Sequence, residues 1–139
     1  MKKFLFLIIL IYLSPFLKAQ DFNPVQSNVD SFLEIATTKK KSKFDLITVV
    51  SKFPPNWITE KDIDKLIKIL DSKVTCKCTI SRLSSFLPSD NAELGGYAVI
   101  FIESFKNNIL IDLGLYSCPE TNSKKTKEII DWWKKYRKK

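Results

Sequence analysis

The chain of 139 residues carries 23 basic and 15 acidic side chains, contains no histidine and has only three glycines. The lack of histidine excludes Ser-His-Asp and Cys-His catalysis, and three glycines are too few for a phosphate-cradling loop. The composition therefore disfavours an enzyme and predicts no cofactor and no metal site. Glu93 and Glu103 are the first carboxylates to consider as an acid–base pair, but a solvated helix position accounts for each.

The first 19 residues have the pattern of a secretory signal peptide. Basic Met1–Lys3 precedes an apolar run from Phe4 to Leu13, and Ala19 stands before the expected cleavage site. The apolar run is too short to span a bilayer, which takes about 20 residues. We therefore expect residues 1–19 to be removed and residues 20–139 to fold as one exported domain, periplasmic or secreted.

The charge of the processed chain is concentrated at its C-terminal end. The formal net charge falls from +8 to +5 once Lys2, Lys3 and Lys18 are removed with the signal. Residues 124–139 alone carry eight basic and two acidic side chains, so the preceding part of the processed chain is close to neutral. The sequence thus predicts a near-neutral domain that ends in a basic element.

Three helices are expected in the first half of the processed chain. Capping residues and apolar spacing predict a helix over residues 23–38. Apolar residues at helical spacing favour another over 44–53, although its β-branched residues leave a strand possible. Thr59 and Asp62 form the pattern of a capping box that starts a helix over 59–70. We expect the last two to form a helical hairpin, and the other helices to pack against 59–70.

The middle of the chain admits two interpretations. Residues 74–80 alternate between apolar and polar side chains, as a strand does. Residues 92–106 have the apolar spacing of a helix. Alternatively, residues 97–116 form an antiparallel β-hairpin, because 97–105 is a near-continuous apolar run and 109–116 alternates. Periodicity alone does not decide between helix and strand here.

Three cysteines indicate one disulfide bond and one free thiol in an oxidising compartment. Cys76 and Cys78 are too close in the chain to bond to each other comfortably. Cys118 is therefore expected to pair with one of them; we favour Cys78–Cys118, and Cys76–Cys118 remains open. A zinc site is disfavoured because three thiols without a histidine make a poor ligand set.

The last segment, from Ser123 to Lys139, has the pattern of a basic amphipathic helix. Its apolar side chains fall within an arc of roughly 160°, and lysines lie opposite them. Two arrangements are open: the apolar side docks on the domain and the lysines are solvated, or the helix offers an exposed binding surface. For the second arrangement, the residues expected to bind a partner are Trp132, Lys134, Lys135 and Arg137.

Short motifs between Trp57 and Cys118 carry a resemblance to a known group. They are a capped helix after the tryptophan, the segment Ser84-Ser85-Phe86-Leu87-Pro88, and an apolar stretch that ends in Ile102-Glu103. Together they resemble small exported proteins of unknown function with stacked, HEAT-like helix pairs. The resemblance implies an all-α fold, a small bundle of stacked helix pairs, and attaches no activity. The alternative fold class is α+β, with the hairpin at about 97–116.

The function expected from the sequence is protein binding without catalysis. A periplasmic immunity or inhibitor protein, which neutralises a toxin or hydrolase by covering its active site, fits the lack of catalytic groups. Its partner is expected to be acidic at the contact surface. The alternatives are a peripheral binder of anionic envelope lipid or polymer through the basic helix, and a structural subunit of an exported assembly. Export disfavours nucleic acid as a partner, and the oligomeric state is left open.

Overall fold

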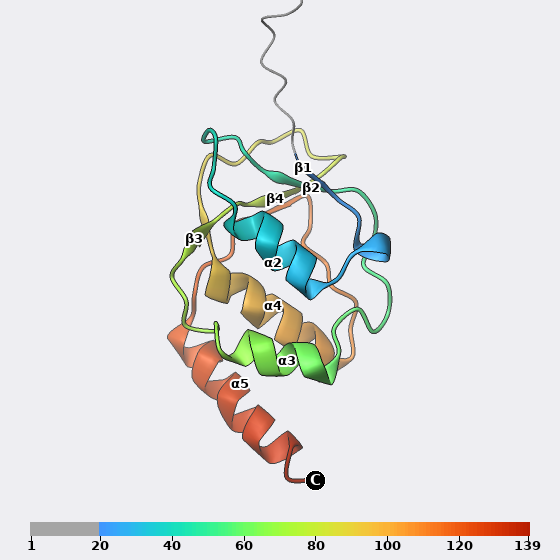
Figure 1. The fold of residues 1–139 in the computed structure, drawn as a ribbon, viewed down its shortest axis with the longest axis vertical. Coiled ribbons are helices and arrows are strands. Elements are labelled where there is room, and N and C mark those ends of the chain that lie inside the picture. The colour runs from blue at the N-terminus through green and yellow to red at the C-terminus, as the bar shows by residue number, and fades with distance from the viewer. Residues whose placement is uncertain (1–19) are drawn as a thin grey trace, which may run out of the picture.

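The computed structural model describes residues 20–139, which combine helices with two small β-sheets (Figure 1). The expected signal peptide, residues 1–19, lies outside the described residues. The helices are η1 (Pro24–Gln26), α2 (Val29–Thr37), α3 (Glu60–Ile67), α4 (Leu94–Asn107) and α5 (Ser123–Tyr136). The strands are β1 (Gln20–Phe22), β2 (Ile47–Val49), β3 (Thr75–Cys76), β4 (Thr79–Ser81), β5 (Ala92–Glu93) and β6 (Tyr116–Ser117). No helix within residues 20–139 is long and apolar enough to cross a bilayer.

The larger sheet is mixed, with the strand order β1-β2-β4-β6. Strands β1, β2 and β4 run parallel, and β6 pairs antiparallel with β4 at one edge. Strands β3 and β5 form a separate antiparallel pair. The predicted all-α bundle of stacked helix pairs is therefore wrong. The chain has the α+β class that was the alternative.

The segment 44–53 accounts for much of this error. Ile47, Thr48 and Val49 form β2 at the centre of the sheet, so no helical hairpin with 59–70 exists. Three consecutive residues with branched Cβ atoms pack well on a pleated surface and lose side-chain freedom in a helix. The apolar spacing that suggested a helix reflects a strand buried between two parallel neighbours.

The ambiguous segment 92–116 contains both kinds of element. Residues 94–107 form α4, which confirms the helix expected there. Most of 109–115 is irregular, and β6 pairs with β4 rather than with the segment before it. A turn breaks the alternating stretch, because Gly114 has a φ of 65° and its N–H donates to Asp112 Oδ1 at 2.8 Å.

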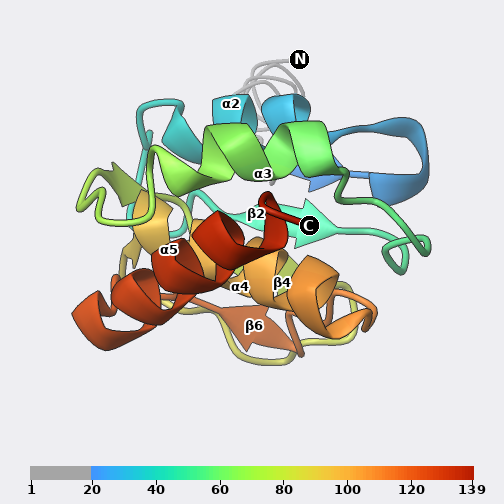
Figure 2. The ribbon, with the colours of Figure 1, turned by 90° about the horizontal axis from the view of Figure 1, so that it is seen from below.

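Helix α4, and not the predicted helix 59–70, is the element against which the other helices pack. It contacts α2, α3 and α5, and Figure 2 shows it between α3 and β6. Two glycines allow this central position: a Cβ atom on Gly95 would lie 2.4 Å from the Leu70 carbonyl oxygen, and one on Gly96 would lie 2.6 Å from the Pro119 carbonyl oxygen. Any side chain at either position would push these segments apart.

The capped helix starts expected near residues 23 and 59 are present. The capping box of α3 forms as predicted, with Asp62 N donating to Thr59 Oγ1 at 3.4 Å and Thr59 N to Asp62 Oδ2 at 2.9 Å. The predicted helix 23–38 is split into η1 and α2, because Asn28 caps α2 through Ser31 N at 2.9 Å. Aromatic side chains also hold the helices together: Phe32 of α2 packs edge-on against Phe101 of α4, with 5.1 Å between the ring centroids.

Candidate functional site

Helix α5 is docked on the domain. Ile129 and Trp133 are buried, and the Trp133 indole N–H donates to Asp64 Oδ1 at 3.3 Å. The Tyr136 hydroxyl donates to Glu60 Oε1 at 2.6 Å, which adds a second link to α3. Figure 2 shows α5 lying across α3 and α4. The docked arrangement is thus the one that the protein adopts, and only the side of α5 away from the body faces solvent.

The solvent side of α5 is strongly basic. It carries only two carboxylates, and its lysines take part in none of the ion pairs found among residues 20–139. We call this set the basic face, and all its members are exposed: Lys124, Lys127, Lys134 and Lys135 of α5, with Lys138 and Lys139 directly after it. Lys125 lies outside it, because its Nζ is 3.7 Å from Glu128 and 3.9 Å from Glu103. Unpaired ammonium groups on a fixed helix create a local positive potential.

The four residues predicted to bind a partner do not form one patch. Lys134 and Lys135 are exposed on the basic face. Trp132 is half-buried and points toward α4, with its ring 6.4 Å from that of Phe105. Arg137 is turned toward α3, where its Nη1 lies 3.3 Å from Asp64. Five residues correspond to about 140° around a helix, so Trp132 and Arg137 project from nearly opposite sides of α5.

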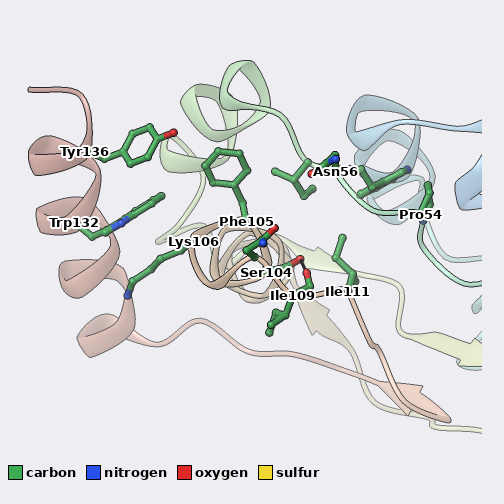
Figure 3. A pocket seen from close by; sticks show the side chains of 12 residues that line it. Pro54, Asn56, Ser104, Phe105, Lys106, Ile109, Ile111, Trp132 and Tyr136 are labelled. Carbon is green, nitrogen blue, oxygen red and sulfur yellow. Dashed lines mark hydrogen bonds between the residues drawn. The ribbon is translucent and has the colours of Figure 1, made fainter. Parts of the chain in front are cut away.

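A small cavity lies beside Trp132, between α4, α5 and the loop before α3 (Figure 3). Its volume is about 270 Å³. Trp132 and Tyr136 project from α5 toward Phe105, and the far wall includes Asn56. Because ligand pockets usually have about 300–1,000 Å³, this cavity suits one side chain of a partner better than a cofactor.

No pattern in the sequence marks this cavity, because its walls come from three separate segments. Asn56 and Asn108, both lining it, are the two non-glycine residues with positive φ among residues 20–139, at 60° and 52°. Asparagine tolerates this conformation better than most residues. An asparagine that follows a predicted helix or a Pro-Pro pair is the one pattern that could have marked these turns.

The disulfide predicted between Cys78 and Cys118 is present, with 4.6 Å between the Cα atoms. The bond joins the residue directly before β4 to the residue directly after β6. Cys76 is a free, buried thiol whose pKa is raised to about 12 by burial and, second, by the Glu93 carboxylate. Its thiolate is therefore scarce at neutral pH, and the sulfur is unsuited to nucleophilic chemistry. Within residues 20–139, no cluster of three or more metal-ligating side chains is present.

The two candidate carboxylates each have a separate partner. Glu93 Oε2 accepts the backbone N–H of Thr121 at 2.7 Å and its hydroxyl at 2.5 Å, and these bonds hold the pKa of Glu93 below its ordinary value. Glu103 pairs with Lys106 at 3.4 Å, and both side chains are half-buried. Neither carboxylate lines any of the three cavities described among residues 20–139.

A buried ion pair stands apart from these surfaces. Lys77 Nζ lies 3.3 Å from Asp45 Oδ1 and 3.3 Å from Gln20 Oε1, and the Lys77 side chain is 3% exposed. The Tyr97 hydroxyl donates to the Lys77 carbonyl oxygen at 2.9 Å, and burial raises the pKa of this phenol. These groups join β1, the 39–45 loop and α4, and none of the described cavities reaches them. Their role is to hold the fold together.

The chain matches no protein-family model, and comparisons with curated proteins and with solved structures give no match.

Proposed function

We propose that this protein is an exported, non-enzymatic protein-binding domain that captures an acidic partner through the basic face of α5. The observation that carries the proposal is the combination of a firmly docked helix with lysines that have no partners of their own. A helix held by Ile129 and Trp133 presents its lysines at fixed positions. Binding to such a surface costs little ordering of the backbone.

The docking of α5 favours a protein partner over a lipid surface. Amphipathic helices bind membranes by burying an apolar face among the lipid headgroups, and electrostatic attraction adds to that. In α5, Ile129 and Trp133 are buried in the domain and are not free for this purpose. The lysines that remain act through charge, which steers association with an acidic protein and speeds their encounter.

An immunity or inhibitor role is consistent with this surface. Toxins and hydrolases with acidic active sites offer the charge that a lysine-rich helix complements, and covering such a site requires no chemistry from the inhibitor. The cavity at Trp132 and Tyr136 borders α5 and can receive a neutral side chain of the partner at the edge of the contact. Charge then guides the partner, and the cavity adds specificity.

The test is capture of a partner from the exported fraction of the protein's own cells by immobilised chain 20–139. Replacing Lys127, Lys134 and Lys135 by alanine should weaken capture by about 10-fold or more, since each lost contact at a charged rim is worth about 0.5 kcal/mol. Replacing Lys39 and Lys41, which are exposed lysines of a distant loop, is the matched control and should leave capture unchanged.

Two further measurements separate this proposal from its alternatives. Capture should weaken as salt rises, because surface charges are screened. Alanine at Trp132, Lys134, Lys135 and Arg137 together should also weaken it, because two lysines of the basic face and one wall of the cavity are lost. Undiminished capture by both variants would refute the assignment to α5. Salt-sensitive binding to anionic vesicles, without any captured protein, would favour the envelope-binding alternative instead.

A further inference from the structure

A second exposed surface is apolar and lies apart from α5. It is formed by two segments, 83–87 and 110–116, which are far apart in the sequence. Phe86 and Tyr116 bring them together, with 4.8 Å between their ring centroids. Its members are between 51% and 85% exposed, and we call them the apolar face: Leu83, Phe86, Leu87, Leu110, Leu115 and Tyr116.

A groove of about 570 Å³ extends this face across the sheet. Leu83 and Leu110 line it from opposite segments, and Val49 and Ile80 of the central strands form part of its floor. Figure 2 shows β6 on the side of α4 away from α3, so the groove and the adjoining face are separate from the contact between α3 and α5. The strand order places β6 at the edge of the sheet beside this groove.

The exposed area lies above the range that is usual for a monomer. Taking about 200 Å² for a fully exposed large apolar residue, the six side chains expose about 700 Å². The largest apolar patch of a typical monomer covers about 300–600 Å², whereas each side of a standard protein interface buries about 800 Å². The apolar face thus has the size of one side of a stable interface.

The face is held in place before any partner arrives. The Cys78–Cys118 disulfide ties together the strands from which the two segments emerge. Pro88 is buried directly after the first segment, and the Ser84 hydroxyl donates to the Phe86 carbonyl oxygen at 2.7 Å inside it. Because the segments are already ordered, association loses little conformational entropy.

Charge distinguishes the kind of partner that this face accepts. Residues 83–89 contain no charged side chain, and Asp112 is the one charged residue of 110–116. The neighbouring Arg82 is paired with Asp21 at 3.2 Å. The positive charge of the processed chain is concentrated in residues 124–139, so two copies that meet at the apolar face keep their basic faces apart.

We propose that the apolar face is the interface of a symmetric dimer of this chain. In a two-fold dimer the same patch serves on both sides, so aromatic side chains such as Phe86 and Tyr116 of one copy face the groove of the other. Each copy keeps its basic face exposed, and the dimer presents two of them. This inference does not depend on the function proposed for α5, because the two surfaces are separate.

The experiment is sedimentation equilibrium of the chain 20–139 over about 1 μM to about 500 μM, a range that covers dissociation constants of moderate interfaces. We expect the weight-average mass to rise from one to two chains. Leu83→Asp and Phe86→Asp, each introducing a charge at the centre of the face, should weaken dimerisation by at least about 100-fold, because an unpaired buried charge costs several kcal/mol.

Two matched controls accompany these variants. Val25→Asp places the same charge at an apolar residue that is 66% exposed and lies outside the face, and it should leave the dimer intact. Lys134→Ala with Lys135→Ala tests the other surface and should also leave it intact. Circular dichroism of each variant establishes that the fold is kept, as expected for substitutions at exposed positions.

Three results would overturn the proposal. The first is a wild-type chain that stays monomeric up to the highest concentration. The second is a dimer that Val25→Asp or the lysine variant weakens as much as Leu83→Asp does. The third is a monomer whose Leu83 and Phe86 are instead needed to bind detergent micelles or a different protein. If the chain stays monomeric but still captures a partner through α5, only the dimer proposal fails. If the chain dimerises but capture does not depend on α5, only the proposed function fails.

Discussion

The buried pair of Lys77 and Asp45 leads to the sharpest prediction about stability. Asp45→Asn keeps the shape of the side chain and an oxygen that can accept the backbone N–H of Lys41, now donated to Asp45 Oδ2 at 2.9 Å. The substitution removes only the negative charge. The Lys77 ammonium, whose side chain is 3% exposed, then retains the Gln20 amide oxygen at 3.3 Å but no carboxylate.

An ammonium group left buried without a counter-charge destabilises a protein by about 3–5 kcal/mol. The remaining hydrogen bond to Gln20 places the expected loss near the lower end, at about 3 kcal/mol. For a chain of this size, that corresponds to a fall in Tm of roughly 10–15 °C. Urea denaturation followed by circular dichroism measures the free energy of unfolding directly.

The double variant Lys77→Met with Asp45→Asn tests the cause. Methionine fills the space of the lysine stem, and the backbone contacts of residue 77 with Tyr97 and Ala36 are kept. Since no unpaired charge remains, the double variant should be more stable than Asp45→Asn alone. A loss below about 1 kcal/mol for Asp45→Asn, or a double variant that shows the sum of both single losses, would refute the reasoning.

Three other outcomes are expected. Replacing Cys78 and Cys118 by serine should lower the free energy of unfolding by about 4 kcal/mol, since the bond closes a loop with a sequence separation of 40; urea titration measures this. Gly96→Ala should destabilise by about 2 kcal/mol despite its better helix propensity, because the new Cβ would meet a backbone carbonyl oxygen at 2.6 Å; calorimetry checks it. Hydrogen bonds from Thr121 lower the pKa of Glu93 below 4.5, so their stabilisation is present above pH 4.5 and is lost as the pH falls through the folded pKa. Thr121→Val should raise that pKa in a carboxyl NMR titration, and an unchanged value would contradict this cause.

The sequence by itself determined the features whose causes are local in the chain. The start of α3 follows from Thr59 and Asp62, whose side chains satisfy backbone N–H groups only three residues away. The extent of α5 follows from its apolar spacing and polar flanks, and the structure begins it at Ser123 as expected. The cysteine count predicted one disulfide from Cys118 to Cys76 or Cys78, and the structure shows that the favoured partner, Cys78, is the one used.

Tertiary structure decided the features in which distant segments meet. The alternation along 74–80 assigns Lys77 to the polar side of a strand, yet its side chain is buried. Burial of the ammonium group is possible because Asp45 and Gln20, from other parts of the chain, bind it. Helical spacing in 44–53 was overridden because β1 and β4 enclose Ile47–Val49 on both sides.

The basic face and the apolar face show the same difference between what the sequence reveals and what only the fold reveals. The lysines of α5 are visible in the sequence as a helical stripe, and only the burial of Ile129 and Trp133 shows which side remains free. The apolar face has no local signature, because Phe86 and Tyr116 lie 30 positions apart and meet only through the β4–β6 pairing. Local hydrogen bonding and periodicity can be read from neighbouring residues, whereas burial depends on which segments the fold brings together.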